Sequence, residues 1–257
     1  MRTLSLAVLY PEIMNIYADR GNTIAMKKRC EWHGIELDVT GIAVGDDMEE
    51  DKYDLLFIGG GQDREQLLIA EDLLSKKEPL KMMADDGTAM LAICGGFQLF
   101  GESYEPKKSP VMEGVGIFDM KTVAGDKRMI GNVVLEVEIE GLMRTLVGFE
   151  NHSGKTILGS GVKPLGKVIE GNGNNGSDNL EGAVYKNVIG TYLHGALLPK
   201  NPWLTDHLIR TALQRRYKEA DLKELDDALE DKAHKAAIAR AKATNKNPSF
   251  VARMFER

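Results

Sequence analysis

Short apolar runs alternate with longer stretches of helical spacing through the N-terminal part of the chain. Strands are predicted where Leu, Ile, Val and aromatic residues gather in short runs, at residues 4–9, 35–39, 53–58 and 88–93. Helices are predicted between these runs, within 14–34, over 64–75 and up to 86, with Gly34 and Gly87 as stop signals. Strands that alternate with helices favour an α/β fold, in which helices cover both faces of a parallel sheet.

The pattern changes after about residue 110, where strand-like runs follow one another with only short connections. These runs lie at residues 111–122, 131–140, 146–151, 180–185 and 188–193. Their spacing predicts an antiparallel section added to the parallel sheet. A helix over residues 202–217 is predicted after the last strand.

The last part of the chain, residues 218–257, differs in composition and is rich in Ala, Lys, Asp and Glu. Leu222, Leu225 and Leu229 follow one another at helical spacing, which predicts a thin amphipathic helix. We therefore divide the chain into a domain at 1–217 and a charged helical tail at 218–257. A helix that packs on its own domain is the simpler interpretation of this tail, and a helix that contacts a partner is the alternative.

Composition and charge exclude several classes of function. The 257 residues carry a net charge of −6, which gives no basic surface for nucleic acid. The two cysteines form no C-x-x-C pair, so neither a disulfide scaffold nor a zinc site is predicted. The first apolar run is too short for a signal peptide, and no run approaches the roughly 20 residues that span a bilayer. We therefore expect a cytoplasmic protein with free thiols.

Cys94 stands between the apolar run at 88–93 and a pattern typical of a helix, and Gly95 and Gly96 follow it. This is the arrangement of a nucleophile elbow, in which a sharp strand-to-helix turn exposes a reactive side chain. The glycines leave room where the chain doubles back. A buried core cysteine is the alternative for any Cys, and it is the interpretation we adopt for Cys30 within its predicted helix.

A cysteine nucleophile needs a base close in space, and histidine is the usual one. His194 is the preferred candidate among five histidines, because it ends an apolar strand and is followed by a glycine that lets a ligand approach. His152 is the second candidate. The other three are interpreted as solvated or structural: His33, His207 and His234.

An acyl transfer also needs donors for the oxyanion of the tetrahedral intermediate. The backbone N–H groups of Gly60, in the glycine turn 59–61, and of Gly95 are the candidates for this oxyanion hole. A phosphate-binding turn is the competing interpretation of the glycine triplet. No Gly-x-x-x-x-Gly-Lys-Ser/Thr loop is present, so no ATP site is predicted in this chain.

Two segments resemble the motifs of a known family. Residues 92–101, Ala-Ile-Cys-Gly-Gly-Phe-Gln-Leu-Phe-Gly, are similar to the nucleophile motif of class I glutamine amidotransferases. Residues 190–195, Gly-Thr-Tyr-Leu-His-Gly, resemble the histidine motif of the cobyric acid synthase branch of that class. Within the branch, residues 14–22, 59–63 and 148–152 look like the glutaminase subunits of lipid II isoglutaminyl synthases. The likeness covers about residues 4–215.

The resemblance implies a flavodoxin-like three-layer sandwich with a mostly parallel central sheet. It implies a glutaminase that hydrolyses L-glutamine with Cys94 and His194 and passes ammonia to a partner. That partner would be a MurT-like Mur ligase, which would hold ATP and Mg²⁺ and amidate D-glutamate in the lipid II stem peptide. No cofactor is then expected in this chain, and no metal site. By the same analogy Arg128, which the pattern puts at the start of a strand, holds the glutamine substrate; a solvated Lys127-Arg128 pair is the alternative.

One position departs from the wider class, which places a Glu two residues after the histidine. Ala196 stands there in this chain, so the site is either a Cys-His dyad or takes its third member from elsewhere, with Glu150 as a candidate. Three other functions remain open at this point: a glutaminase that serves cobyrinic or cobyric acid amidation, a non-catalytic regulatory subunit, and a peptidase of the same broad fold.

Overall fold

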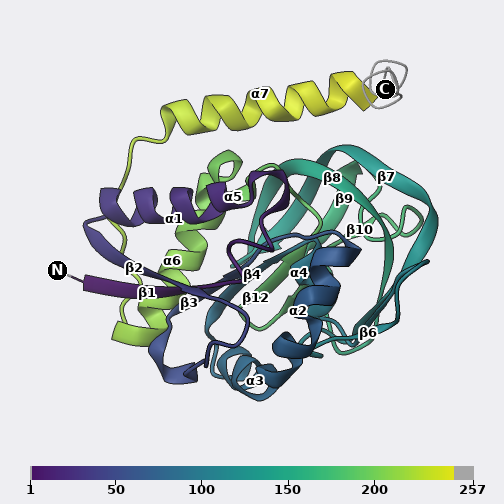
Figure 1. Ribbon diagram of the computed structural model, residues 1–257. Helices are drawn as coiled ribbons and strands as arrows, with labels where there is room; N and C mark the ends of the chain where they lie inside the picture. Colours follow the sequence, from purple (N-terminus) through teal and green to yellow (C-terminus); the bar gives the residue numbers. More distant parts are fainter. Residues whose placement is uncertain (1, 246–257) are drawn as a thin grey trace.

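A six-stranded sheet in the order β11-β12-β4-β3-β1-β2 forms the centre of the computed structural model, which describes residues 2–245 (Figure 1). All neighbours in this sheet pair in parallel except β11, which is antiparallel to β12. The strands are β1 (Arg2–Leu9), β2 (Ile35–Ile42), β3 (Leu55–Ile58), β4 (Ala89–Ile93), β11 (Ala183–Tyr185) and β12 (Val188–Thr191). Every residue of β3, β4 and β12 is buried, as expected for strands covered on both faces.

Helices cover the two faces of this sheet (Figure 1). One face is covered by α1 (Arg20–Trp32) and α6 (Pro202–Tyr217), and the other by α2 (Asp63–Ser75), α3 (Lys77–Asp85) and α4 (Gly95–Leu99). Short helices fill the connections: η1 (Ile16–Ala18), η2 (Glu50–Lys52) and α5 (Leu197–Lys200). The predicted three-layer α/β architecture with a mostly parallel sheet is therefore confirmed.

A second sheet, in the order β10-β9-β7-β5-β6 with β8 paired to β7, lies beside the first. Its strands are β5 (Ser103–Glu105), β6 (Met112–Glu113), β7 (Met120–Ile139), β8 (Leu142–Leu158), β9 (Gly166–Glu170) and β10 (Leu180–Glu181). The predicted strand at 111–122 is wrong in its middle. There the N–H groups of Val115 and Ile117 bond to carbonyls of Leu99 and Phe100, so the chain wraps around the end of α4 instead of extending.

The tail is helical over a shorter range than the leucine spacing predicts. Helix α6 ends at Tyr217, followed by Lys218 in a left-handed conformation (φ 60°), and the next helix, α7, begins only at Ala228 and ends at Asn245. The segment between them has no regular secondary structure, and two of its side chains contact the domain: Leu222 packs on the core and Asp227 pairs with Arg29. Residues 246–257 of the predicted tail lie outside the described residues.

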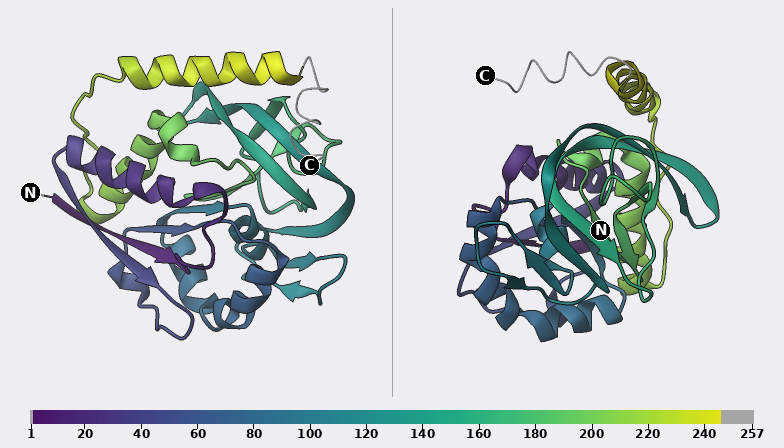
Figure 2. Two further views of the ribbon diagram at one scale, coloured as in Figure 1. Left: turned by 45° about the horizontal axis from the view of Figure 1, so that its top comes forward. Right: turned by 90° about the vertical axis from the view of Figure 1, so that its right-hand side faces the viewer.

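Helix α7 lies across the second sheet rather than apart from it (Figure 2). Ala241 is buried against Val134 and Val147, and His234 contacts the hydroxyl of Thr145 at 2.8 Å. Within residues 2–245 the tail therefore packs on its own domain. No helix in this part of the chain has the length and apolar character needed to cross a bilayer.

The carboxyl ends of the parallel strands meet at one edge of the first sheet. The chain leaves β1 towards Tyr17 and Asp19, leaves β3 into the turn 59–61, leaves β4 at Cys94, and leaves β12 towards His194. In open α/β sheets, ligands bind outside the carboxyl ends of the strands, so this edge is the expected place for a site.

Candidate active site

Cys94 occupies a strained turn between β4 and α4. Its backbone has φ 49° and ψ −102°, a conformation that is uncommon for residues with a side chain and typical of functional turns. A Cβ on Gly95 would lie 2.8 Å from the carbonyl oxygen of Gly61, and one on Gly96 would lie 2.8 Å from that of Gly59. Only glycines allow this turn to pack against 59–61, as the elbow pattern predicts.

The surroundings of Cys94 differ from those of Cys30. The Cys94 N–H donates to the carbonyl of Thr191 at 2.8 Å, and the residue stands at the start of α4. Cys30 has no exposed surface within α1, and burial raises the pKa of its thiol to about 12. Cys30 is thus an inert core residue, whereas Cys94 lines a cavity of about 490 Å³.

His194 follows β12 and is held there by its backbone. Its N–H donates to the carbonyl of Phe149 on β8 at 2.7 Å, and the Phe149 N–H returns a bond at 3.3 Å. Burial alone would lower the pKa of this imidazole, but the negative charges of Cys94 and Asp19 outweigh it and raise the pKa to about 10. A thiol and an imidazole coupled in this way can share one proton as a thiolate and an imidazolium.

Asp19 is the third member of this group, and the sequence interpretation did not identify it. Its Oδ2 lies 3.4 Å from Nδ1 of His194, and both side chains are fully buried. Glu150 was the wrong candidate, because its carboxylate accepts bonds from the N–H groups of Asn172 and Gly173, at 2.8 and 3.0 Å. The available signal was the place of Asp19 after β1, at the same sheet edge as Cys94.

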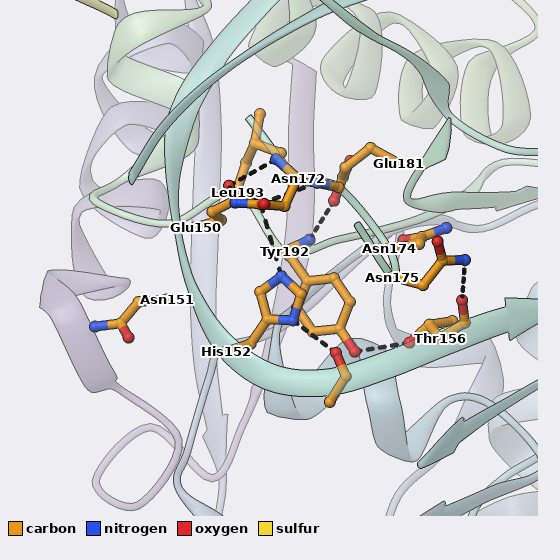
Figure 3. A network of polar contacts seen from close by, with 12 residues as sticks. Glu150, Asn151, His152, Thr156, Asn172, Asn174, Asn175, Glu181, Tyr192 and Leu193 are labelled. Carbon is orange, nitrogen blue, oxygen red and sulfur yellow. Dashed lines mark hydrogen bonds and ion pairs between the residues drawn. The ribbon is translucent and has the colours of Figure 1, made fainter. Parts of the chain in front are cut away.

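His152, the second candidate base, lines the cavity, whereas the fully buried His194 is not among the lining residues; both ring nitrogens of His152 nevertheless face protein groups (Figure 3). Nδ1 lies 2.8 Å from the carbonyl of Gly154, Nε2 lies 3.8 Å from Glu150, and the ring stacks on Tyr192 at 3.5 Å. The remaining histidines contact other groups: His33 bonds to Asp206, His207 to Glu140, and His234 to Thr145 and Lys200. Geometry thus favours His194 as the base.

The predicted oxyanion hole needs a correction. The N–H of Gly60 donates to Oδ2 of Asp19 at 2.8 Å, in a buried bond, and cannot also bind an oxyanion. Gly61 lies next to Gly95, and within residues 2–245 neither of their N–H groups has a hydrogen-bond acceptor. Gly61 also lines the cavity with Cys94. Gly61 is therefore a better candidate than Gly60 for the partner of Gly95.

Arg128 lines the same cavity as Cys94. The prediction that it stands at the start of a strand is wrong, because it lies inside β7, where the pairing with β8 is interrupted between Ala124 and Met129. This bulge turns the exposed Arg128 towards Asn151, whose Oδ1 accepts a bond from its Nε. Its Nη2 lies 3.4 Å from the Tyr17 hydroxyl, and within residues 2–245 Nη1 has no hydrogen-bond partner, so this end of the guanidinium is available to a carboxylate.

A chain of amides and hydroxyls supports the floor of the cavity. Gln66 donates to the carbonyl of Gly61 at 3.1 Å and to Gln98 at 3.0 Å. Gln98 donates to the hydroxyl of Tyr192 at 3.2 Å, and that hydroxyl bonds to Thr156 at 2.7 Å (Figure 3). These buried hydrogen bonds link the glycine turn to Tyr192, which stands two residues before His194.

Comparisons with known proteins show the family of this chain. Residues 5–202 match the family model described as "CobB/CobQ-like glutamine amidotransferase domain". The Staphylococcus aureus (strain N315) protein named "Lipid II isoglutaminyl synthase (glutamine-hydrolyzing) subunit GatD" is 40% identical, over 96% of this chain and 100% of that protein. The protein of that name from Streptococcus pneumoniae (strain ATCC BAA-255 / R6) is 42% identical, over 83% and 82%.

A solved structure described as "Crystal structure of glutamine amidotransferase" has the same fold. It superimposes with a TM-score of 0.54 at 18% identity and covers 80% of this chain and 98% of its own. The resemblance predicted from the motifs around Cys94 and His194 is thereby confirmed. The chain belongs to the CobB/CobQ-like family of glutamine amidotransferases.

Proposed function

We propose that this chain is the glutamine-hydrolysing subunit of a lipid II isoglutaminyl synthase, with Cys94 as nucleophile and His194 as base. The observation that carries the chemistry is the placement of a cysteine on a strained elbow beside a buried imidazole of raised pKa. The names of the two relatives, which match this chain over most of its length, support the pathway.

The first half of the proposed reaction forms a thioester. The Cys94 thiolate attacks the carboxamide carbon of L-glutamine, and the N–H groups of Gly61 and Gly95 stabilise the resulting oxyanion. The His194 imidazolium gives its proton to the nitrogen, the C–N bond breaks and ammonia leaves. Asp19 holds Nδ1 of the imidazole, so the other nitrogen carries this proton transfer.

The second half of the reaction returns the enzyme to its starting state. Neutral His194 takes a proton from water, and the hydroxide attacks the thioester carbon. The C–S bond then breaks, glutamate leaves and the thiolate is restored beside the imidazolium. One glutamine and one water have become one glutamate and one ammonia, so no redox partner is required.

Replacing Asp19 by asparagine is expected to lower kcat at neutral pH by about tenfold or more, because the imidazole loses its orienting charge. Asp19 also raises the pKa of His194, so the variant's imidazolium loses its proton at lower pH. The alkaline fall of kcat, where the acid for ammonia departure is lost, should therefore move to lower pH. Profiles of kcat against pH for both proteins test this, and an unchanged alkaline limb would argue against an orienting Asp19.

Replacing Arg128 by lysine is expected to raise KM for glutamine by roughly tenfold or more, because lysine cannot reproduce a bidentate fork on the α-carboxylate. The chemical step should change less, since Arg128 acts in this proposal on the α-carboxylate and not on the carboxamide that Cys94 attacks. Steady-state glutamate release over a range of glutamine concentrations measures both constants. Unchanged kinetics at limiting glutamine would mean that Arg128 is only a solvated residue.

We further propose that ammonia passes to a MurT-like Mur ligase, in a heterodimer with this chain. The ligase would bind ATP and Mg²⁺ and activate the α-carboxyl of D-glutamate in the lipid II stem peptide, so this chain would need no cofactor. We propose the cytoplasm as the place of reaction, since ATP and reduced thiols are both available there.

Reconstitution tests this proposal. The two chains are mixed with lipid II, ATP, Mg²⁺ and glutamine, and the product mass is measured. The complex with Cys94→Ala should fail with glutamine and still amidate lipid II with ammonium salts, because only the ammonia source is lost. Failure with ammonium as well would mean that Cys94 does more than release ammonia. If this chain binds no such ligase, the lipid II assignment is wrong and glutaminase activity alone is left to test.

A further inference from the structure

Tyr17 stands out among the residues around the cavity because its backbone is strained and its two ends touch different functional groups. It lies inside η1 with φ 55° and ψ 34°, a left-handed conformation that is unusual for a bulky residue. The segment is held in place on the glycine turn, since the N–H of Ile16 donates to the carbonyl of Gly60 at 3.1 Å. Strain of this kind is kept where the surroundings demand one orientation.

The hydroxyl end of Tyr17 belongs to the Arg128 group. Nε of Arg128 can only donate, so its partner on Asn151 is the amide oxygen, and the amide nitrogen of Asn151 must face Tyr17. That nitrogen donates to the Tyr17 hydroxyl oxygen at 2.6 Å, and Arg128 approaches the same oxygen at 3.4 Å. Figure 3 shows Asn151 pointing away from its neighbours Glu150 and His152.

This arrangement leaves the proton of the Tyr17 hydroxyl unused. The oxygen accepts from Asn151 and Arg128, and within residues 2–245 the hydroxyl donates to no acceptor. The side chain lines the cavity that holds Cys94 and Arg128 and is 40% exposed. A free O–H beside a guanidinium fork is a site for a carboxylate oxygen, because both groups present donors to one point.

The ring end of Tyr17 packs on His194. The two rings meet edge to face, with centroids 5.1 Å apart and planes at 72°. This contact shields a fully buried imidazole on the side of the cavity. One side chain thus joins the substrate end of the site to the base.

We propose that the hydroxyl of Tyr17 donates a hydrogen bond to the α-carboxylate of bound glutamine, next to Arg128, while its ring packs on His194. The inference rests on the proposed glutaminase function and adds a substrate-positioning residue to it. The hydroxyl acts on binding, whereas the ring acts on the base, so the two contributions can be separated by substitution.

The test compares two reagents that alkylate Cys94. A diazoketone analogue of L-glutamine keeps the α-carboxylate, whereas iodoacetamide lacks it. Tyr17→Phe should slow labelling by the limiting diazoketone about tenfold, the loss expected for one hydrogen bond to a charged group. Labelling by iodoacetamide should stay within about twofold, because the ring remains on His194. In glutamate-release assays the same variant should raise KM and leave kcat nearly unchanged.

Tyr185→Phe is the matched control, since it removes a hydroxyl that bonds to Asp85 at 2.8 Å away from the cavity. It should change neither labelling rate. Equal losses with both reagents in Tyr17→Phe would overturn the proposal, as would no loss with either. If wild-type Cys94 reacts no faster with the diazoketone than with iodoacetamide, the glutaminase proposal itself fails, whatever Tyr17 does.

Discussion

Replacing Cys94 by alanine is expected to reduce glutamine hydrolysis by more than about 10³-fold, because no other group can form the covalent intermediate. The side chain is 7% exposed and lies on a turn held by backbone bonds, so the fold should survive. Glutamate release measures the activity, and circular dichroism together with the thermal midpoint reports the fold.

Cys30→Ala is the matched control for this experiment, because it removes the other thiol of the chain from a fully buried place in α1. It is expected to lower stability through a small cavity and to keep the activity of the folded protein. Loss of hydrolysis in Cys30→Ala with retention in Cys94→Ala would reverse the assignment of the nucleophile.

Replacing His194 by alanine is expected to lower kcat by about 10²–10⁴-fold, the usual contribution of a general acid and base. The loss should be largest at neutral pH, where the imidazolium that stabilises the Cys94 thiolate would be missing. Glutamate release by the folded variant measures it, and iodoacetamide labelling of Cys94 should slow in parallel because less thiolate is present.

His152→Ala gives the comparison, since His152 lines the same cavity but turns its ring nitrogens to Gly154 and Glu150. Its activity should exceed that of His194→Ala by at least about tenfold per folded molecule. The opposite order would mean that His152 is the base and that the contact of His194 with Asp19 is structural.

Much of the fold follows from the periodicity of apolar residues. The predicted helices at 64–75 and 202–217 agree with α2 and α6, because their apolar spacing and boundary signals point the same way. The helix prediction is wrong at 218–227, where Leu222 and Leu225 have helical spacing but the chain forms no helix and Asp227 pairs with Arg29. A contact between residues so distant in the chain has no signature in a local pattern.

The site residues also divide into those with a local signal in the sequence and those that depend on contacts between distant residues. Cys94 and His194 could be predicted because each ends an apolar strand and is followed by glycine, which is a local signal. The role of Asp19 could not be predicted, because a polar loop after β1 does not reveal which side chain turns inward to His194. The same inward side chain of Asp19 accepts the N–H of Gly60. The sequence could not reveal this bond either, and for that reason Gly60 was wrongly predicted in the oxyanion hole.

A rapid-quench experiment tests most directly the claim that Cys94 carries the acyl group of glutamine. The protein, with its ligase partner if free activity is low, is mixed with glutamine, acidified within the first turnovers, digested and examined by mass spectrometry. The predicted result is one glutamyl group on the peptide that contains Cys94, released by hydroxylamine and absent from Cys94→Ala. Glutamate production without any adduct on Cys94, at a rate that Cys94→Ala matches, would contradict the assignment.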